Sequence, residues 1–369
     1  MRQPEDELAE LKAQSLLRKL PETPSGCVNF ASNDYLGLAS HPRIVRAYQE
    51  ALSEHGAGST ASRLVCGNTS PHIRLEELLA DAKGTEAAIT FATGFATSTG
   101  VLTTILQPGD TVVMDKLCHA SLIDGARMSG ATIRVFPHNH LDKLERILRN
   151  HQPSNNSRLL VVTESVFSMD GDLADLVSIS RLTKQYGALL MVDEAHALGV
   201  LGPSGMGLAE ELDIADQIDF HMGTLGKAAG VAGGYLAASR AWVDFIINKA
   251  RSLIYSTAPP PAQAAAAAEA ISLIRSDGGS ALRQKLWQNI RKFSADATSA
   301  IIPHIVGGSD HAMDISCRLR QQGILAPAIR FPTVPRNTAR LRITISANHS
   351  SEQIAQLQQA LLDVGQSPS

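Results

Sequence analysis

Residues 223–234, GTLGKAAGVAGG, place a single lysine, Lys227, among small and apolar residues with no acidic residue beside it. A lysine in apolar surroundings has a lowered pKa, and its neutral amine is then a nucleophile toward carbonyl groups. Two polar residues of interest precede it, because Asp193 ends the apolar run ALLMVD and His196 follows three residues later. These three side chains are the first candidates for chemistry.

Such residue types suit the cofactor pyridoxal 5'-phosphate (PLP). PLP needs a lysine for a Schiff base and an acid that keeps its pyridine nitrogen protonated, together with donors for its phenolate oxygen and a nest for its phosphate. Lys227, Asp193 and His196 match the first three needs, and Thr224, one turn before the lysine, could reach a phosphate oxygen. Taken alone, Asp193 and His196 would more often be a turn cap and a buried structural histidine.

Other candidate residues also follow predicted strands. Gly94 and Phe95 lie where the run AAITF gives way to a helix, and backbone N–H groups at a helix start bind phosphate well. His119 in DKLCHASLIDGA could stack on a flat cofactor, and Ser168 in VFSMDGD could donate to its oxygens. Each also has a purely structural interpretation, as a turn glycine, a surface histidine or a loop cap.

A cluster of arginines surrounds a predicted strand in IRFPTVPRNTARLRIT, namely Arg330, Arg336, Arg340 and Arg342. Strand alternation puts Arg340 and Arg342 on one face. Arginines on a solvated strand face are common, but a bidentate guanidinium is also a usual way to hold a substrate carboxylate. The cluster is therefore a candidate substrate site.

The letters DEAH also spell the acidic box of nucleic-acid-stimulated ATPases, an interpretation from a different class of protein. That class needs a phosphate-binding loop of the form G-x-x-x-x-G-K-[ST]. At the best candidate, Gly226-Lys227, Ala228 replaces the Ser or Thr, and His221 occupies the position of the first glycine. The pair also lies after the acidic box instead of before it, so we reject the ATPase interpretation.

The elements that must position these residues follow a regular pattern. Short apolar runs predict strands at 87–91, 110–115, 131–136, 158–163, 188–193 and 235–239, and helical patterns separate most of them. Helices are also predicted at 5–19, 262–275 and 351–364, and a strand at 339–346. Strands that are apolar throughout and alternate with helices indicate an α/β fold with a largely parallel sheet buried on both faces. The candidates lie at the C-terminal ends of the strands, where ligands bind in such sheets.

We expect three segments, which are an N-terminal segment at 1–38, a large PLP-binding domain at 39–274 and a smaller C-terminal domain at 275–369. Of the 369 residues, 44% are hydrophobic and 19% charged, as in a globular enzyme. The net charge of −3 gives no basic footprint for nucleic acid. The four cysteines form no CxxC pair, which argues against a zinc site and favours a reducing compartment. With no signal-like N-terminus or membrane-length apolar run, we expect a cytoplasmic protein that binds no metal, nucleic acid or membrane.

Taken in order, several motifs resemble the α-oxoamine synthases: GF at 94–95, DKLCHASLIDG, TESVFSMDGD, VDEAHALG, TLGK and ARLRI. These fold-type I PLP enzymes join an amino acid to an acyl-CoA with loss of CO₂. The resemblance runs from about residue 29 to residue 349. It implies a large domain with a mostly parallel sheet flanked by helices, a smaller C-terminal α+β domain, and a homodimer with a shared active site.

Carried onto this sequence, the resemblance implies a role for each candidate. Lys227 would form the Schiff base and act as general base, Asp193 would contact the pyridine nitrogen, and His119 would stack on the ring. His196 and Ser168 would donate to the phenolate oxygen. The phosphate would be held by a further set of residues, namely Gly94, Phe95, Thr224 and, from the neighbouring subunit, Thr257.

On the substrate side, the resemblance implies that Arg342 and Asn33 bind the amino-acid carboxylate, with Arg18 and Thr333 nearby. LIYSTAPPPAQ, AIRFPTVPRNTARLRIT and the surroundings of VFSMDGD are most similar to the member that joins L-alanine to a pimeloyl thioester in biotin biosynthesis. GTLGKA is closer to the member that makes 5-aminolevulinate. Members that use acetyl- or palmitoyl-CoA, and a PLP-binding protein without catalysis, are further alternatives.

The sequence departs from the family pattern at three places. Thr60-Ala61 stands where the family usually has a Gly-Gly pair, and Ala229 replaces the usual Phe two residues after the lysine. PETPSGCVNF lacks the small hairpin that commonly precedes SNDYLG. We expect these differences to affect substrate choice and the Arg18 assignment, not the cofactor set.

Overall fold

The structure is a computed structural model that describes residues 3–14, 16–18, 20, 22, 26–152 and 156–365. It divides into two compact units. The larger unit comprises Asn33–Ser168 and Asp172–Trp287, and the smaller comprises Met1–Ser32, Met169–Gly171 and Gln288–Ser369. Each unit is built around its own β-structure, so each is described by itself.

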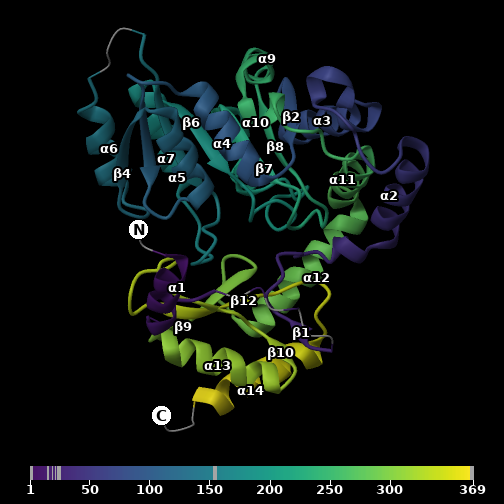
Figure 1. The fold of residues 1–369 in the computed structure, drawn as a ribbon, viewed down its shortest axis with the longest axis vertical. Helices are drawn as coiled ribbons and strands as arrows, with labels where there is room; N and C mark the ends of the chain where they lie inside the picture. Colours follow the sequence, from purple (N-terminus) through teal and green to yellow (C-terminus); the bar gives the residue numbers. More distant parts are fainter. Residues whose placement is uncertain are drawn as a thin grey trace. The chain divides into compact units, whose positions relative to one another are not determined.

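A seven-stranded sheet forms the centre of the larger unit, in the order β2–β8–β7–β6–β5–β3–β4 (Figure 1). The strands are β2 (Ala87–Phe91), β3 (Thr111–Asp115), β4 (Thr132–Phe136), β5 (Leu159–Glu164), β6 (Leu189–Asp193), β7 (Phe220–Thr224) and β8 (Gly234–Ala238). Strands β3 to β7 are parallel to one another, and β8 is antiparallel to both β2 and β7. The predicted largely parallel sheet is thereby confirmed.

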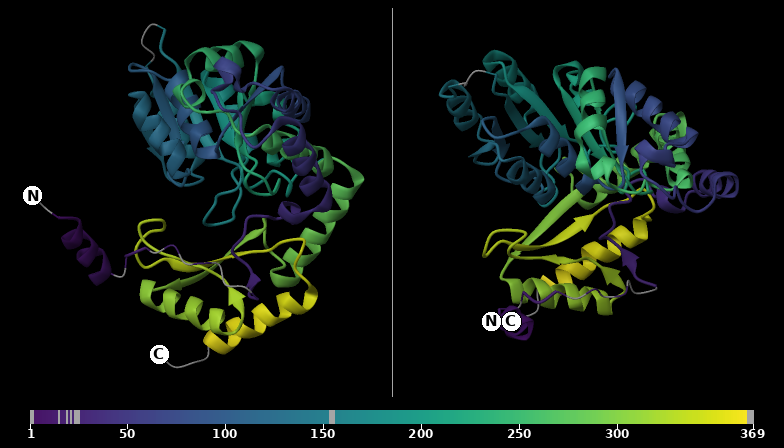
Figure 2. Two further views of the ribbon diagram at one scale, coloured as in Figure 1. Left: turned by 45° about the vertical axis from the view of Figure 1, so that its right-hand side comes forward. Right: turned by 45° about the horizontal axis from the view of Figure 1, so that its top comes forward.

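Helices cover both faces of this sheet (Figures 1 and 2). On one face, four helices share an apolar cluster with the strands: α4 (Gly94–Ile105), α5 (Ala120–Ser129), α9 (Arg240–Lys249) and α10 (Arg251–Ile254). Two others, α6 (Leu141–Arg149) and α7 (Leu176–Tyr186), contact β4 and β6. The remaining helices are α2 (Pro42–His55), α3 (Ser70–Lys83), α8 (Leu208–Glu211), α11 (Pro261–Ile274) and α12 (Asp277–Phe293). All residues of β2, β3 and β5 are buried, and these strands are mostly apolar with no polar–apolar alternation.

A buried ion pair ties α3 to the end of β6. Lys83 Nζ lies 2.6 Å from Oε2 of Glu194, and their side chains are 3% and 0% exposed. Glu194 Oε1 also accepts the N–H of Ala209 at 3.0 Å. Burial alone would raise the pKa of Glu194, but the Lys83 ammonium lowers it to about 2. Since Glu194 follows Asp193 directly, this pair fixes the backbone beside the predicted cofactor acid.

The smaller unit contains a three-stranded antiparallel sheet in the order β11–β12–β9, with β9 at Ile301–Gly307, β11 at Ala328–Ile329 and β12 at Ala339–Thr344. Its helices are α1 (Pro4–Ala13), α13 (Ser309–Gln321) and α14 (Ser351–Gly365). Strand β1 (Val28–Asn29) pairs in parallel with β10 (Ile324–Leu325), so the residues just before Asn33 belong to this unit.

The six strands predicted between residues 87 and 239 are confirmed to within one residue at each end. The predicted helix 5–19 is wrong in its length, because α1 ends at Ala13 and the N–H groups of Leu16 and Leu17 turn back to the carbonyl of Leu11. Residues 15 and 19 of that range lie outside the described residues. Strands β7 and β9 were not located from the sequence.

The compact units divide at Trp287–Gln288. The reason is that the first part of α12 is anchored to the larger unit, where Arg283 donates to the carbonyl of Pro203 and Trp287 to that of Val200. Compactness does not test independent folding, so the domain ranges 1–38, 39–274 and 275–369 stay predictions.

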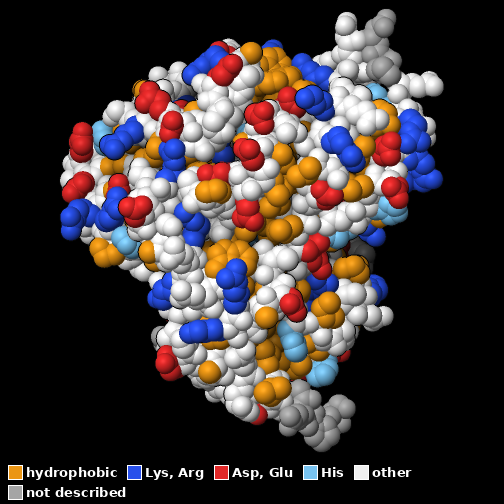
Figure 3. Space-filling model, turned by 180° about the vertical axis from the view of Figure 1, so that it is seen from behind, with side chains coloured by type: hydrophobic (Ala, Val, Ile, Leu, Met, Phe, Trp, Pro, Cys, Tyr) orange, Lys and Arg blue, Asp and Glu red, His pale blue; other side chains and the backbone are white. Residues whose placement is uncertain are grey.

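On the face shown in Figure 3, acidic and basic side chains are interspersed, in keeping with the small net charge. Within the described ranges, no helix has the length and apolar character needed to cross a bilayer.

Candidate active site

The C-terminal edge of the large sheet gathers carboxyl groups. Asp115 ends β3, Glu164 ends β5 and Asp193 ends β6, and all three are buried. The next parallel strand, β7, ends at Thr224, three residues before Lys227. Residues separated along the chain therefore meet at one edge because the parallel strands end there.

A chain of hydrogen bonds runs from the lysine through a histidine and a tyrosine. Lys227 Nζ lies 2.8 Å from His196 Nε2, and His196 Nδ1 lies 2.5 Å from the Tyr35 hydroxyl. The Tyr35 hydroxyl also donates to Asn33 Oδ1 at 3.2 Å. With that proton given to Asn33, the Tyr35 oxygen accepts from Nδ1–H of His196, which leaves Nε2 to accept from Lys227. This proton arrangement leaves the Lys227 amine with an acceptor beside it.

Tyr35 was not among the residues selected from the sequence. It is fully buried, and it lies 161 residues before its histidine partner. The available signal was its place in SNDYLG, one of the segments that carries the resemblance. Asn33, in contrast, was predicted as a substrate residue, and the structure connects it to Lys227 through Tyr35 and His196.

Asp193 lies in an environment that disfavours its charge. Its Oδ1 accepts the N–H of Ala195 at 2.9 Å. Burial raises the pKa of Asp193, and the nearby Lys227 opposes that rise. A cation placed against Asp193 would therefore be stabilised strongly, as a protonated pyridine nitrogen requires.

His119 forms the N-cap of α5. Its Nδ1 accepts the N–H of Ser121 at 3.2 Å and lies 2.8 Å from the Ser121 hydroxyl, while its own backbone N–H donates to Glu164 Oε1. The His119 side chain is exposed at the sheet edge, with both Asp193 and Lys227 in electrostatic range. The structure thus brings the predicted ring-stacking residue to the same edge as the predicted acid and lysine.

The predicted phosphate site joins three segments. Helix α4 begins at Gly94, so the first N–H groups of the helix, including those of Gly94 and Phe95, have no acceptor within it. A Cβ on Gly94 would lie 3.3 Å from Cβ and Oγ1 of Thr224, and a Cβ on Gly234 would lie 2.7 Å from Cα of Gly94. Thr224 Oγ1 also accepts the N–H of Gly226 at 3.2 Å. The approach of Gly234 to Gly94 requires glycine, whereas a Cβ on Gly94 would need only a slight shift of Thr224. The first N–H groups of α4 are donors of the kind that binds phosphate.

Ser168 is buried and lies in the loop that follows β5. Upstream, the N–H of Ser165 donates to the Asp193 carbonyl at 2.9 Å, which holds the loop beside the end of β6. After Ser168 in the same loop, Asp172 contacts His138 at 2.7 Å. His138 also contacts Asp115, the last residue of β3, at 3.1 Å. Burial alone would lower the pKa of His138, but the two carboxylates raise it to about 10. The imidazolium therefore fastens the loop to the end of β3 throughout the neutral range.

The remaining predicted residues are not all joined to this group. Thr257 is exposed and forms a β-bridge with Ser62, and among the described residues no hydrogen bond links it to Thr224 or Lys227. Arg342 and Thr333 belong to the smaller unit, as does Arg18, whose guanidinium lies 3.5 Å from the Thr333 hydroxyl. Their substrate roles stay predictions.

Two arginines of the cluster, Arg340 and Arg342, have different hydrogen-bond partners. Arg340 donates to Asp170 Oδ1 at 2.6 Å and to the Met169 carbonyl at 3.2 Å. Arg342 is buried on β12, and its Nη1 donates to the Thr344 hydroxyl at 3.0 Å. Arg340 therefore serves the structure of the smaller unit, a role that strand alternation did not reveal.

The departures from the family pattern also have structural outcomes. Thr60 adopts a φ of 56°, in the left-handed region that glycine favours, so the loop keeps a glycine-type conformation at this position despite the substitution. Ala229 is fully buried. Residues 21 and 23–25 of the segment PETPSGCVNF lie outside the described residues.

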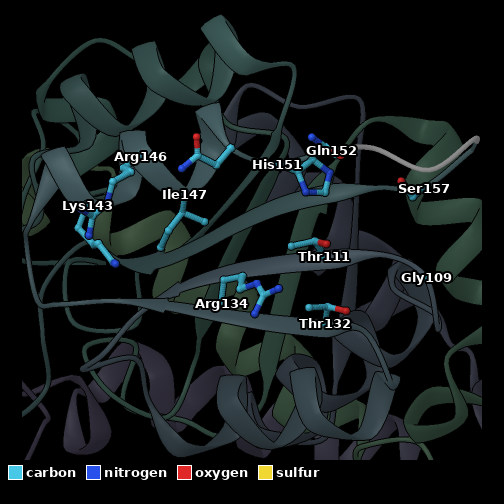
Figure 4. A pocket seen from close by; sticks show the side chains of 11 residues that line it. Gly109, Thr111, Thr132, Arg134, Lys143, Arg146, Ile147, His151, Gln152 and Ser157 are labelled. Atoms are coloured by element: carbon cyan, nitrogen blue, oxygen red, sulfur yellow. The ribbon is translucent and has the colours of Figure 1, made fainter.

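In the described part of the chain, no group of His, Cys, Asp and Glu is arranged to hold a metal ion. A cavity at the other end of β3 and β4, drawn in Figure 4, is lined by the basic side chains of Arg134, Lys143, Arg146 and His151. It starts from Thr111 and Thr132, the first residues of those strands, and so lies away from the Lys227 edge.

Sequence comparisons identify full-length relatives. The family described as "Aminotransferase class I and II" matches residues 25–361. The 8-amino-7-oxononanoate synthase of Geobacter sulfurreducens is 44% identical over 97% of this chain and 97% of its own length. That of Citrifermentans bemidjiense is 46% identical over 90% of this chain and 88% of its own length.

Solved structures agree on the fold. A serine palmitoyltransferase from S. paucimobilis with a bound PLP–myriocin aldimine has a TM-score of 0.90 and 28% identity, covering 97% of this chain and 96% of that one. The 8-amino-7-oxononanoate synthase of Francisella tularensis has a TM-score of 0.78 and 28% identity, covering 92% and 97%. The predicted fold and the resemblance to α-oxoamine synthases are confirmed.

The tyrosine in the hydrogen-bond chain gives a test in the protein without ligands. Tyr35→Phe removes the partner of buried His196 Nδ1, and an unsatisfied buried polar group costs about 1–3 kcal/mol of unfolding free energy. Tyr186→Phe is the control, because Tyr186 bonds Glu145 at the half-exposed surface and its loss should cost no more than about 0.5 kcal/mol. Urea unfolding measures both, and equal costs for the two variants would contradict the buried chain.

Proposed function

Because the chain belongs to the aminotransferase class I and II family, we propose that it is a PLP-dependent acyltransferase acting in biotin biosynthesis. The reaction is the decarboxylative condensation of L-alanine with pimeloyl-CoA, or pimeloyl-acyl carrier protein, to give 8-amino-7-oxononanoate, CO₂ and the free thiol. Several full-length relatives carry the name 8-amino-7-oxononanoate synthase, which supports this choice within the family.

The observation that carries the proposal is the convergence of Lys227, His196 and Asp193 at the edge where α4 begins. The lysine has an acceptor 2.8 Å away, the acid is buried, and Gly94 and Thr224 form an anion cradle. These groups fit PLP, because they match its aldehyde, its phenolate oxygen, its pyridine nitrogen and its phosphate. When bound, PLP supplies an electron sink for the amino-acid carbon.

Each candidate cofactor residue of the larger unit then has a defined role. Asp193 would hold the pyridine nitrogen in its protonated form, and His119 would stack on the ring. Ser168 and His196 would hydrogen-bond the phenolate oxygen, with the His196 proton on Nε2 and its Nδ1 accepting from Tyr35 when the cofactor is bound. The N–H groups of Gly94 and Phe95 bind the phosphate. Because these groups are held by the sheet and by the start of α4, they are oriented before any ligand binds.

Proton transfer is the task of Lys227. As a neutral amine beside His196 Nε2, it takes the proton from Cα of alanine, and it later returns a proton to the same carbon. Between these steps, alanine Cα bonds to the thioester carbonyl carbon, the C–S bond breaks with the electron pair going to sulfur, and the carboxylate leaves as CO₂. The amine must be neutral to accept a proton.

The substrate side is assigned to the predicted residues. By the family resemblance, Arg342 and Asn33 would bind the alanine carboxylate, and Thr333 and Arg18 would also contact the substrate. The domain at 39–274 would carry the cofactor, and that at 275–369 would carry Arg342. The four cysteines have no disulfide partner, which supports a reducing cytoplasm as the location.

A second copy of the chain completes the site. Leu64 and Val65 are 54% and 77% exposed, and they follow Ser62, which pairs with Thr257. Tyr255, two residues before Thr257, is also exposed, at 71%. Large apolar side chains gathered at one surface mark an interface. We assign it to a homodimer in which Thr257 reaches the phosphate of the neighbouring subunit.

Two other α-oxoamine synthase activities stay as alternatives, those of glycine C-acetyltransferase and 5-aminolevulinate synthase. A protein that binds PLP without catalysis is a more remote alternative. The amino acid and the acyl thioester distinguish them all.

The first prediction concerns the lysine. Wild-type protein with PLP should show the visible absorption band of a lysine-linked cofactor, and Lys227→Ala should lose both this band and all turnover.

The substrates are identified by thiol release, measured for alanine, glycine and serine, each with pimeloyl-, acetyl-, succinyl- and palmitoyl-CoA. Alanine with pimeloyl-CoA is expected to react fastest, and faster reaction of glycine with succinyl-CoA would replace the proposal with 5-aminolevulinate synthesis.

The second prediction concerns the carboxylate site. Arg342→Ala removes a charge-assisted hydrogen bond of about 1.5–3 kcal/mol, so KM for alanine should rise roughly 10- to 100-fold while PLP stays bound. Arg320→Ala, an exposed change on α13, is the matched control and should leave KM unaltered. Loss of PLP in Arg342→Ala would mean that this arginine serves the cofactor instead.

The third prediction concerns the interface. Light scattering should give twice the mass of one chain, and Val65→Asp should reduce the mass to that of a monomer and weaken PLP binding. Val177→Asp places the same charge on another exposed valine, at 49% exposure on α7, and should leave the dimer intact. A monomeric wild-type protein that binds PLP tightly would refute the shared site.

A further inference from the structure

Glu164 is a buried acid that the proposed chemistry does not use. It is the last residue of β5 and is 2% exposed, and it pairs in register with Asp193, the last residue of β6, which is 6% exposed. Paired residues of neighbouring parallel strands point to the same side of the sheet. Two buried carboxyl groups therefore lie side by side at the cofactor edge.

The other buried carboxyl groups of this edge have cationic partners. Asp115 contacts His138 at 3.1 Å, and Glu194 contacts Lys83 at 2.6 Å. Across the described ranges of the chain, no Lys, Arg or His side chain lies within ion-pair distance of Glu164. The titratable groups that face it are Asp115 from β3, Cys118 and His119 from the turn before α5, Asp193 from β6 and Lys227 from the loop after β7.

These surroundings favour the uncharged form of Glu164. Burial and then the negative charge of Asp193 raise the pKa of Glu164 well above its usual value, and Lys227 only partly opposes them. Two carboxyl groups that share one dry site cannot both ionise at low cost. In the protein itself, Lys227 and the N–H of Ala195 favour the ionised form of Asp193, which leaves the proton to Glu164.

Glu164 also makes a hydrogen bond to the backbone just before α5. Its Oε1 accepts the backbone N–H of His119, the residue that caps α5. A neutral carboxylic acid accepts at its carbonyl oxygen and still has an O–H to donate. The residue can therefore hold the His119 backbone without placing a second negative charge beside Asp193.

We propose that Glu164 is a positioning residue that works as a neutral carboxylic acid, keeping Asp193 the single anion of the pair and fixing the backbone of His119 at the start of α5. The part that concerns the cofactor rests on the function proposed above. The charge state of Glu164 does not, because it follows from the protein alone.

The charge state is tested in protein without PLP, by thermal unfolding of Glu164→Gln and Glu194→Gln between about pH 5 and about pH 8. Since the pKa of Glu164 is higher in the folded state, its ionisation after unfolding makes the wild type less stable as the pH rises above the unfolded value. Glutamine cannot ionise, so Glu164→Gln should melt at or above the wild-type temperature near pH 8, and the advantage should shrink toward pH 5.

Glu194→Gln is the matched control, because it removes the anion of a buried ion pair and leaves the Lys83 ammonium buried without that anion. It should lower the melting temperature across the same pH range, since the pKa of Glu194 is about 2. If Glu164→Gln lowers the melting temperature near pH 8 as much as Glu194→Gln does, Glu164 is ionised and the proposal is overturned.

The positioning role is tested by PLP titration. Glu164→Gln keeps an acceptor for the His119 N–H and should bind PLP within about threefold of wild type, whereas Glu164→Ala should bind at least about tenfold more weakly. Tight binding by Glu164→Ala, or weak binding by Glu164→Gln, would overturn the positioning role. A wild-type protein that binds no PLP would refute the proposed function instead, and the unfolding comparison would still decide the charge of Glu164.

Discussion

Charge balance at the C-terminal edge of one buried sheet is the constraint on which the larger unit depends. A carboxylate taken out of water is costly unless a cation or several donors compensate it. Strands β3, β5 and β6 all end on such a residue, and Glu194 follows at once. Lys83 of α3 pairs with Glu194, and His138 after β4 pairs with Asp115. Asp193 is left facing Lys227.

The topology of the sheet explains why these groups meet. Parallel strands bring their last residues to one edge, so Glu164 and Asp193 become neighbours although 29 positions separate them. The antiparallel strand β8 enters between β2 and β7 and brings Gly234 against Gly94 at the start of α4. Lys227 lies on the connection between β7 and β8. The lysine and the anion cradle are therefore consequences of the same strand insertion.

Much of this could be predicted from the sequence, because the central strands are apolar runs and a polar residue at the end of such a run is conspicuous. Asp193 and His196 are selected on that ground, and Lys227 is selected because it is the single charged residue of GTLGKAAGVAGG. Strand β7, FHMGT, has no β-branched residue before its final threonine, and β9, IIPHIVG, contains a proline, so neither has a typical strand signature.

Partners far apart in the chain were beyond the reach of local patterns. The Lys83–Glu194 pair spans 111 residues, and the Tyr35–His196 bond spans 161. Periodicity tells which face of an element is buried, but not which distant group lies opposite. Glu164 was overlooked for the same reason, because its interest lies in its register with Asp193.

The two neighbouring arginines of β12 show the same limit in its sharpest form. Alternation puts Arg340 and Arg342 on one face, and nothing in ARLRIT distinguishes them. The distinction comes from Asp170, which belongs to the tripeptide Met169–Gly171 that the smaller unit holds. Gly171 is fixed there because a Cβ would lie 2.0 Å from the carbonyl oxygen of Ile301, and its own carbonyl accepts from Ser299 at 2.7 Å. Asp170 is thus held where it engages Arg340, so the fold and not the strand pattern decides which of the two arginines has a structural duty.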